Sequence, residues 1–340
     1  MKRPEGITRY QWLRYNFYFV LEHFIGYTNF EKIAGKRRDA LFVQIDKQLK
    51  GSNRGELLEL PTVTGEISME EFNKKYVNNV LPVLFKGAAN EWVCTKKWSF
   101  DFFKEQYGKS EISLIDNVGV IDRDNPQKFE QTTFADYIDQ LRAGSLKYLK
   151  FSRIMDEDSS LKNDVDLNWL RKFMSFSSIR EQFFMFMGVK NTITPIHNGF
   201  AHTIFIQVTG KKRWILWEPN ERIFLDPRPE RRSYWYSNAD PNKEENPSFP
   251  LFKYAKRYEV ILEPGDVLWF PGLLWHQVEN TTDSISIAYK FVDIPSVFKS
   301  SRILAPLFFL STKPNIFIQF FFQQINKTDY IFTKKREELK

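Results

Sequence analysis

TPIHNGFAHTIFIQVTGKKRW, the stretch from Thr194 to Trp214, decides the fold of this chain. It contains His197 and His202, two of the four histidines of the sequence, and then alternates apolar and polar residues as a strand does. A third histidine, His276, lies in a second strand-like segment, PGDVLWFPGLLWHQV. A barrel can form a metal site from histidines on two strands that are distant in sequence and lie side by side. A carboxylate two residues after His197 would complete such a site, but the chain has Gly199 there.

The composition suits a chain with a large buried core. At 340 residues the sequence is long enough for one large domain or two smaller ones, and aromatic residues make up 16% of it, as expected for a thick sandwich or barrel. Cys94 is the single cysteine, which excludes an internal disulfide framework and suits a reducing compartment. Because the N-terminus lacks the apolar core of a secretory signal, we expect a cytoplasmic protein.

The net charge of +7 raises the question of nucleic-acid binding. The basic residues are scattered, however, and neither zinc-finger spacing nor a glycine-aromatic RNA-binding signature accompanies them. We therefore expect no nucleic-acid partner, and we interpret the charge as a solvated basic surface or as attraction for an anionic substrate.

The N-terminal residues 1–61 predict a helical extension followed by a linker. Residues 9–25 have the spacing of an amphipathic helix, in which we expect His23 to be structural. The expected buried face of this helix consists of Leu13, Phe17, Val20, Leu21 and Phe24. Residues 35–62 carry many charges and few apolar residues in their second half, which is typical of a linker.

From residue 182 onward the pattern becomes that of a β-protein. Turn residues separate most of seven strand candidates: Phe183–Val189, Thr203–Val208, Arg213–Trp217, Tyr258–Leu262, Val267–Phe270, His276–Glu279 and Ser284–Phe291. Several short strands with long connections favour an antiparallel double-sheet barrel over a parallel α/β fold. We expect a mainly β barrel domain over residues 62–295, with helices at its flanks.

Residues 296–340 predict a C-terminal helical segment rich in Phe, Leu and Ile. Arg302, Lys313 and Pro314 interrupt its apolar run, so we expect no membrane span but two short helices joined near Lys313–Pro314. These helices could pack on the N-terminal helix or form a homodimer interface. Attachment to a membrane surface is the weaker alternative.

Residues 219–253 are rich in proline and in charged residues, which predicts a long loop or insert. The aromatic residues 234–236 at its centre would suit a substrate lid. An ordinary surface loop is the favoured interpretation.

The histidines and one lysine carry the chemistry that the sequence offers. A non-haem iron site commonly uses two histidines and one carboxylate and leaves three positions for cosubstrate and oxygen. His197 and His276 have the spacing for such a site, and Lys212 sits where an adjacent strand begins and could pair with an acidic cosubstrate. On these residues alone, an iron site and a pair of structural histidines with a surface lysine are equally good interpretations.

Longer segments from about residue 62 to 293 resemble the JmjC-like cupin family, which includes protein hydroxylases. The matching segments are Pro82–Gly108, Thr194–Pro219, Phe249–Asn280 and Ser284–Phe291. The resemblance implies a double-stranded β-helix (cupin or jelly-roll) core with iron(II) and 2-oxoglutarate as cofactors. It also implies oxidation of an unactivated C–H bond, normally hydroxylation, of a peptide, protein or amino-acid-like substrate.

The same resemblance implies roles for individual residues. His197 and His276 would be the histidine ligands of the metal. Thr194 and Lys212 would bind the distal carboxylate of 2-oxoglutarate, a charge-assisted contact in the case of the lysine, and Thr203 would lie near this cosubstrate.

Gly199 departs from the family's pattern, which has Asp or Glu at this position. A hydroxylase could complete the coordination with a carboxylate from elsewhere or with water. A halogenase would place chloride in the vacant position, and an inactive relative would keep the barrel as a binding module. His202 would need a bulge to turn toward the metal, so we do not expect it to be a ligand.

The resemblance also implies that Trp275, beside His276, lines the pocket.

Overall fold

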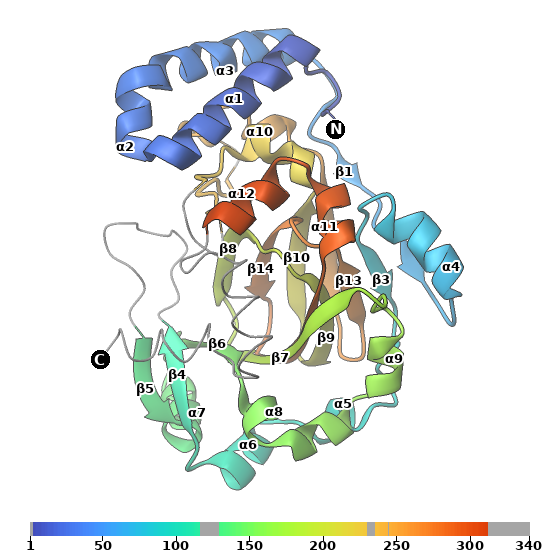
Figure 1. Ribbon diagram of the computed structural model, residues 1–340. Helices are drawn as coiled ribbons and strands as arrows, with labels where there is room; N and C mark the ends of the chain where they lie inside the picture. The colour runs from blue at the N-terminus through green and yellow to red at the C-terminus, as the bar shows by residue number, and fades with distance from the viewer. Residues whose placement is uncertain (1–2, 116–128, 230–234, 244, 312–340) are drawn as a thin grey trace.

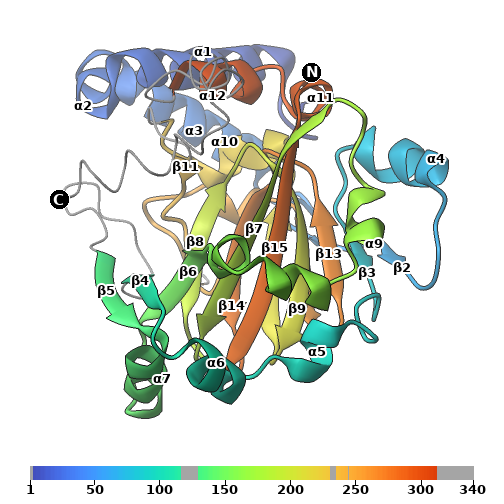
Figure 2. The ribbon, with the colours of Figure 1, turned by 60° about the horizontal axis from the view of Figure 1, so that its bottom comes forward.

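The computed structural model describes residues 3–115, 129–229, 235–243 and 245–311 (Figure 1). Two β-sheets face each other and enclose a layer of apolar side chains that both sheets contribute. Helices cover the ends of this barrel, with α1 to α3 and α12 at one end and α5 to α7 at the other (Figure 2). The expected double-stranded β-helix with helical flanks is confirmed.

The first sheet has six strands in the order β1-β12-β10-β14-β8-β11. They are β1 (Leu57–Leu58), β12 (Arg257–Leu262), β10 (Lys212–Trp217), β14 (Trp275–Asn280), β8 (Ile193–Asn198) and β11 (Trp235–Tyr236). The second sheet has nine strands in the order β2-β3-β13-β9-β15-β7-β6-β4-β5. They are β2 (Thr62–Val63), β3 (Val83–Phe85), β13 (Val267–Phe270), β9 (His202–Thr209), β15 (Ser284–Asp293), β7 (Ser178–Gly188), β6 (Tyr148–Ser152), β4 (Glu111–Ile115) and β5 (Phe129–Thr133).

The helices lie before, between and after these strands. They are α1 (Arg9–Ile25), α2 (Tyr27–Phe30), η1 (Glu31–Gly35), α3 (Lys36–Leu49), α4 (Met69–Phe72), η2 (Asn73–Val77), α5 (Val93–Lys97), α6 (Phe100–Tyr107), α7 (Phe134–Arg142), α8 (Ile154–Glu157), η3 (Ser159–Asp164), α9 (Leu167–Arg171), η4 (Pro219–Glu221), α10 (Arg222–Leu225), η5 (Phe252–Tyr254), α11 (Ile294–Ser300) and α12 (Leu304–Ser311). No helix of the described residues is long and apolar enough to cross a membrane.

Alternation along the strands separates the barrel interior from an outer core. On β15, Ala288 points inward and joins the interior cluster, which also contains Phe205, Trp214, Phe270 and Val278. Ile285, Ile287 and Tyr289 point outward and join the outer cluster, which also contains Trp269. All seven predicted strands are present. Strand β8 was missed because Pro195 interrupts its pattern, and proline is uncommon inside a strand.

Helix α1 has the predicted bounds but turns a different face to the protein. Leu13 and Phe17, which we expected to be buried, are 54% and 62% exposed, whereas Trp12 and Tyr15 are buried. The rest of the predicted face is half-buried or exposed: Val20, Leu21 and Phe24. The Tyr15 hydroxyl donates to the Arg222 carbonyl at 3.0 Å, and the Arg222 guanidinium lies 4.5 Å from the centre of the Trp12 ring. The buried face of α1 is therefore the one that donates a hydrogen bond to the backbone of α10 and contacts its Arg222 side chain.

The first half of the predicted linker is a helix. In α3, Leu41, Phe42, Ile45 and Leu49 are buried at helical spacing and pack with α1. Four apolar residues on one face are enough to dock a helix, even when the rest of its sequence is charged.

The first of the two helices expected at the C-terminus is itself divided at residues 301–303 into α11 and α12. The break expected near Lys313–Pro314 lies outside the described residues. Helix α12 packs in one apolar cluster with α1, and the Ser311 hydroxyl lies 3.3 Å from Nε2 of His23. His23 is buried, and its Nδ1 lies 3.0 Å from the Pro229 carbonyl, which agrees with the structural role expected for it.

The insert at residues 219–253 is not an ordinary surface loop. Its strand β11 lies at the edge of the first sheet beside β8. Trp235 is fully buried, with its ring centroid 4.1 Å from that of Phe308 in α12. Tyr234 lies outside the described residues. The insert thus extends the barrel wall next to the strand that carries His197.

Candidate active site

His197 and His276 face each other at the end of β8 and the start of β14. They are directly opposite in this antiparallel pair, and their ring centroids are 4.2 Å apart. Opposite residues of an antiparallel pair project from the same face of the sheet. His276 packs on Trp214 and Phe270, which belong to the interior cluster. Both histidines therefore point into the barrel.

The backbone orients both imidazole rings. Nδ1 of His197 lies 2.8 Å from the Pro195 carbonyl, and Nδ1 of His276 lies 3.1 Å from the Leu274 carbonyl. A carbonyl can only accept a hydrogen bond, so Nδ1 carries the proton in each ring and Nε2 carries the lone pair. Histidines that bind metals commonly donate their other N–H in this way.

Burial keeps both rings neutral. Loss of solvent lowers the pKa of His197 to about 3, and it lowers the pKa of His276 well below its ordinary value. The charges of Lys290 and Lys150 lower the pKa of His197 further. A metal binds the neutral imidazole, so the pair is in the protonation state that coordination requires.

An irregularity in β8 brings Thr194 to the same face as the histidines. His276 pairs with His197, but Val278, two residues on, pairs with Thr194, three residues back. The extra residue on β8 is a bulge, which reverses the alternation between Thr194 and His197. Because Val278 packs in the interior cluster, Thr194 also faces the interior.

Lys212 lies inside the barrel rather than on its surface. It is 0% exposed, and its Nζ donates to the Tyr148 hydroxyl at 3.1 Å. Burial and the nearby charge of Lys150 lower the pKa of Lys212 to about 7. The surface-lysine interpretation of Lys212 is therefore wrong. Tyr148 is a neighbour of this candidate site residue that the sequence did not mark.

Thr203 and His202 are neighbours on β9 and point to opposite faces. Thr203 is 3% exposed and pairs with Phe270 of the interior cluster. His202 stacks on Trp269 of the outer cluster, with Nδ1 accepting from the Gly272 amide and Nε2 lying 2.7 Å from the Ser296 hydroxyl. The expectation that His202 is not a metal ligand agrees with this position.

Aromatic side chains enclose the histidine pair. Tyr236 of the insert is opposite His197 and stacks on it, and Trp214 stacks on His276. Trp275 does not wall the pocket as we predicted. It packs on the outer face of β14, in the apolar cluster that contains α1 and α12. Neighbouring residues of a strand point to opposite faces, so Trp275 points away from the side that His276 faces.

The described residues contain no group of three His, Cys, Asp or Glu side chains that could hold a metal. Gly199 contributes only backbone groups, and its carbonyl accepts a hydrogen bond from the Leu273 amide at 2.7 Å. The histidine pair nevertheless fits a first-row metal in ligand type, tautomer and charge. The candidate metal site in this part of the chain thus offers two histidine ligands.

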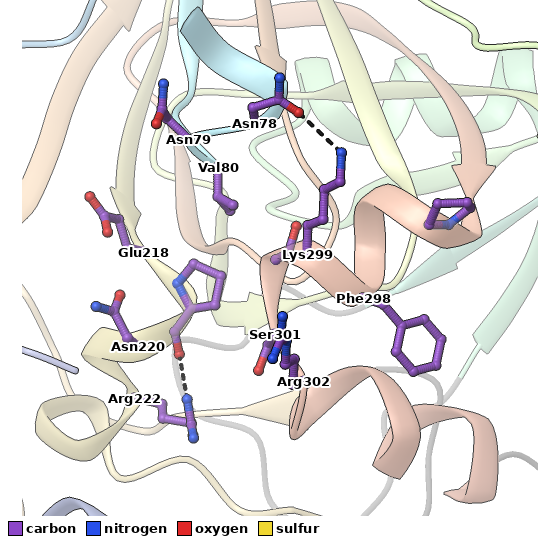
Figure 3. A pocket seen from close by; sticks show the side chains of 13 residues that line it. Asn78, Asn79, Val80, Glu218, Asn220, Arg222, Phe298, Lys299, Ser301 and Arg302 are labelled. Carbon is purple, nitrogen blue, oxygen red and sulfur yellow. Dashed lines mark hydrogen bonds between the residues drawn. The ribbon is translucent and has the colours of Figure 1, made fainter. Parts of the chain in front are cut away.

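A separate cavity of about 710 Å³ lies between η4, α11 and residues 78–80 (Figure 3). Its lining includes Glu218, Lys299 and Arg302 but neither histidine of the pair. Lys299 donates across it to the Asn78 side chain at 3.1 Å. This cavity is not the candidate metal site.

The fold and the paired histidines define a cupin, and comparison with known proteins agrees. The chain belongs to the cupin-like domain family, whose model matches residues 69–327. The predicted resemblance to the JmjC-like cupins is confirmed.

Named relatives show which proteins this chain is similar to. It is 22% identical to lysine-specific demethylase 8 of Xenopus tropicalis over 77% of this chain and 62% of the relative. It is 25% identical to the 2-oxoglutarate and iron-dependent oxygenase JMJD4 of Mus musculus over 66% of this chain and 58% of the relative. It is 26% identical to tRNA wybutosine-synthesizing protein 5 of Homo sapiens over 71% of this chain and 80% of the relative. The chain therefore spans somewhat less than two-thirds of the length of the first two.

Proposed function

We propose that this chain is an iron(II)- and 2-oxoglutarate-dependent oxygenase that hydroxylates an unactivated C–H bond. The observation that carries the proposal is the buried, neutral pair His197 and His276, which shares the barrel interior with the buried Lys212. The printed name of the mouse relative, an iron- and 2-oxoglutarate-dependent oxygenase, supports it.

In this proposal, His197 and His276 hold the iron. Lys212 binds the distal carboxylate of 2-oxoglutarate together with Thr194, and Thr203 lies beside the cosubstrate. The hydroxyl of Tyr148, which accepts a hydrogen bond from Lys212, would donate a hydrogen bond to the same carboxylate. A buried ammonium that carries a carboxylate forms a charge-assisted hydrogen bond, which is stronger than a neutral one.

When bound, iron(II) supplies the oxidising chemistry in which 2-oxoglutarate and oxygen become succinate and carbon dioxide and a substrate C–H becomes C–OH. The residues of this chain orient the reactants and exclude water. Trp214, Phe270 and Tyr236 surround the histidine pair with rings, which keeps the site poor in water. The names of the relatives, a lysine demethylase and a tRNA-modifying protein, leave open a peptide, protein or amino-acid-like substrate.

Anaerobic titration with iron(II) and 2-oxoglutarate tests the proposal. The wild type should develop the visible charge-transfer band of chelated 2-oxoglutarate. His197→Ala should abolish the band, and Lys212→Met should demand far more 2-oxoglutarate to produce it. The matched control is Lys211→Met, because Lys211 is the exposed neighbour of Lys212 and pairs with Glu263 at the surface. The absence of a band in the wild type would refute the oxygenase proposal.

Halogenation is the second candidate, and Gly199 is the residue that favours it. A glycine in place of the carboxylate frees space and one negative charge for chloride. Chloride should then shift the visible spectrum of the loaded protein, and Gly199→Asp should remove that shift. A spectrum that is indifferent to chloride would leave hydroxylation as the enzymatic reaction.

A non-catalytic binding module, a homodimer and a cytoplasmic location are the remaining proposals. Retention of 2-oxoglutarate without iron, and without turnover of any substrate, would support the binding module. Light scattering on the full chain tests the dimer. Removal of residues after 296 is a poor test, because α12 is part of the core that α1 and the insert share. The domain limits at residues 62 and 295 stay predictions.

A further inference from the structure

Three lysines approach one another inside the barrel. Lys150 of β6 is 7% exposed and Lys212 of β10 is 0% exposed, while Lys290 of β15 is partly buried. Nζ of Lys212 lies 5.6 Å from the centre of the Tyr148 ring, which Lys150 also contacts, and Lys290 is paired with Thr203, a residue that faces the interior. The three side chains therefore surround the same interior space as the histidine pair.

Aromatic rings hold these side chains. Nζ of Lys150 lies 4.9 Å from the centre of the Tyr148 ring, and Nζ of Lys212 lies 5.1 Å from that of Phe205. Nζ of Lys290 lies 5.2 Å from the centre of the Phe151 ring. Cation–π contacts of this kind offset part of the cost of burying an ammonium group, but not all of it.

Lys150 and Lys212 form no ion pair with any acidic side chain of the described residues. Each makes one hydrogen bond there, to the Ile193 carbonyl at 3.3 Å and to the Tyr148 hydroxyl at 3.1 Å. An ammonium group has three donors, and buried charges in proteins are normally paired. Both lysines therefore have donors to offer to an anion.

The proposed cofactors do not neutralise this pocket. Iron(II) and the dianion of 2-oxoglutarate sum to zero charge. A carboxylate ligand would add one negative charge, but Gly199 adds none. Binding of the cosubstrate by Lys212 thus leaves Lys150 inside the barrel without a counter-charge from the described residues.

We propose that the barrel takes an anionic substrate, a small molecule with a carboxylate or phosphate group, and that Lys150 binds this group. The proposal builds on the oxygenase function above. The carbonyl that holds Lys150 belongs to Ile193, which directly precedes Thr194 on the strand that carries His197. The acid group would therefore anchor the substrate within reach of the histidine pair.

Binding measurements on the full chain test the role of Lys150. The protein is loaded anaerobically with iron(II) and 2-oxoglutarate and titrated by calorimetry with benzoate or phenyl phosphate, each compared with its neutral match, benzamide or phenol. We expect at least one acid to bind about tenfold or more tightly than its match, as a charge-assisted hydrogen bond provides. Lys150→Met should remove this preference and change the 2-oxoglutarate affinity less than about threefold.

Lys147→Met is the matched control, because Lys147 precedes the same strand but pairs with Glu130 near the surface; it should change neither affinity. A preference that persists in Lys150→Met, or the lack of any preference in the wild type, would overturn the proposal. So would a loss of 2-oxoglutarate affinity equal to that of Lys212→Met, because Lys150 would then belong to the cosubstrate. Whether the protein binds iron(II) and 2-oxoglutarate at all tests the oxygenase proposal separately. If it binds neither, the affinities for each acid and its neutral match are compared on the protein without iron(II) and 2-oxoglutarate, and this comparison decides the role of Lys150. A thermal melt verifies that each variant is folded.

Discussion

Replacement of Lys212 by methionine should make the protein more stable while it destroys the proposed 2-oxoglutarate site. The lysine is 0% exposed, and burial lowers its pKa from 10.5 to about 7. A difference of this size corresponds to about 5 kcal/mol against the charged form. At pH 7.5 the cost to the folded state is about 4 kcal/mol, because part of the folded population is already neutral. The variant also loses the hydrogen bond to Tyr148, which lowers its stability by about 1 kcal/mol.

The unfolding free energy of Lys212→Met should therefore exceed that of the wild type by about 3 kcal/mol, and this difference depends on pH in a defined direction. The pKa of folded Lys212 lies below that of the unfolded chain, so the unfolded chain binds more protons between about pH 7 and 10.5. The stability of the wild type rises with pH across this window. The advantage of the methionine variant is thus greatest at or below about pH 7 and disappears above pH 10.5.

Thermal unfolding in the absence of ligands measures this gain. For a chain of this size we expect a rise in Tm on the order of 5 °C at pH 7. At a fixed concentration of iron(II), added 2-oxoglutarate should raise the Tm of the wild type and leave that of Lys212→Met nearly unchanged. Lys211→Met, which removes only an exposed ion pair, should stay within about 0.5 kcal/mol of the wild type. A Lys212→Met variant that is less stable than the wild type and still binds 2-oxoglutarate would refute the reasoning.

The remaining predictions concern other parts of the molecule. His202→Ala should lower the free energy of unfolding by about 2–4 kcal/mol, measured with denaturant, because it removes two buried hydrogen bonds. It should leave the visible band of the titration with iron(II) and 2-oxoglutarate unchanged. Loss of that band would make His202 part of the metal site. The affinity for 2-oxoglutarate should fall about fivefold from pH 7 to 8 as Lys212, with its pKa of about 7, loses its proton. Calorimetry should detect proton uptake on binding, and a pH-independent affinity would contradict a lysine contact. Trp12→Ala should cost about 3–5 kcal/mol, whereas Phe17→Ser should change the unfolding free energy by less than about 0.5 kcal/mol; equal losses would mean that the outer face of α1 is covered in solution.

The sequence by itself determined the architecture and the histidine pair. Alternating residues mark seven strands, and the side-chain period of two sets which residues face the interior. With four histidines in the chain, His197 and His276 were a narrow choice, and the structure brings them to 4.2 Å between ring centroids. The residue pattern marked Lys212, whereas the family resemblance added Thr194 and the roles of both residues, which stay predictions.

Only the tertiary structure decided which faces are buried and which side chains complete the site. Helix α1 offers aromatic residues on more than one face, and the face that is buried is the one that packs in the apolar cluster with α3 and α12 and bonds to α10 through Tyr15. Trp275 and Trp214 are both adjacent to His276, one along the chain and one across the sheet, and only the second faces the interior. Local patterns cannot reveal contacts between distant strands, because such contacts depend on register.

The stretch Thr194–Trp214 shows the same division. Its sequence contains the proposed metal ligand His197, and it has Gly199 where the family has a carboxylate. The bulge that turns Thr194 inward, and the meeting of Lys212 with Tyr148 and Lys150, arise from strand pairing and burial. The charge of the pocket is a sum over several strands, so no single segment of the sequence could have shown it.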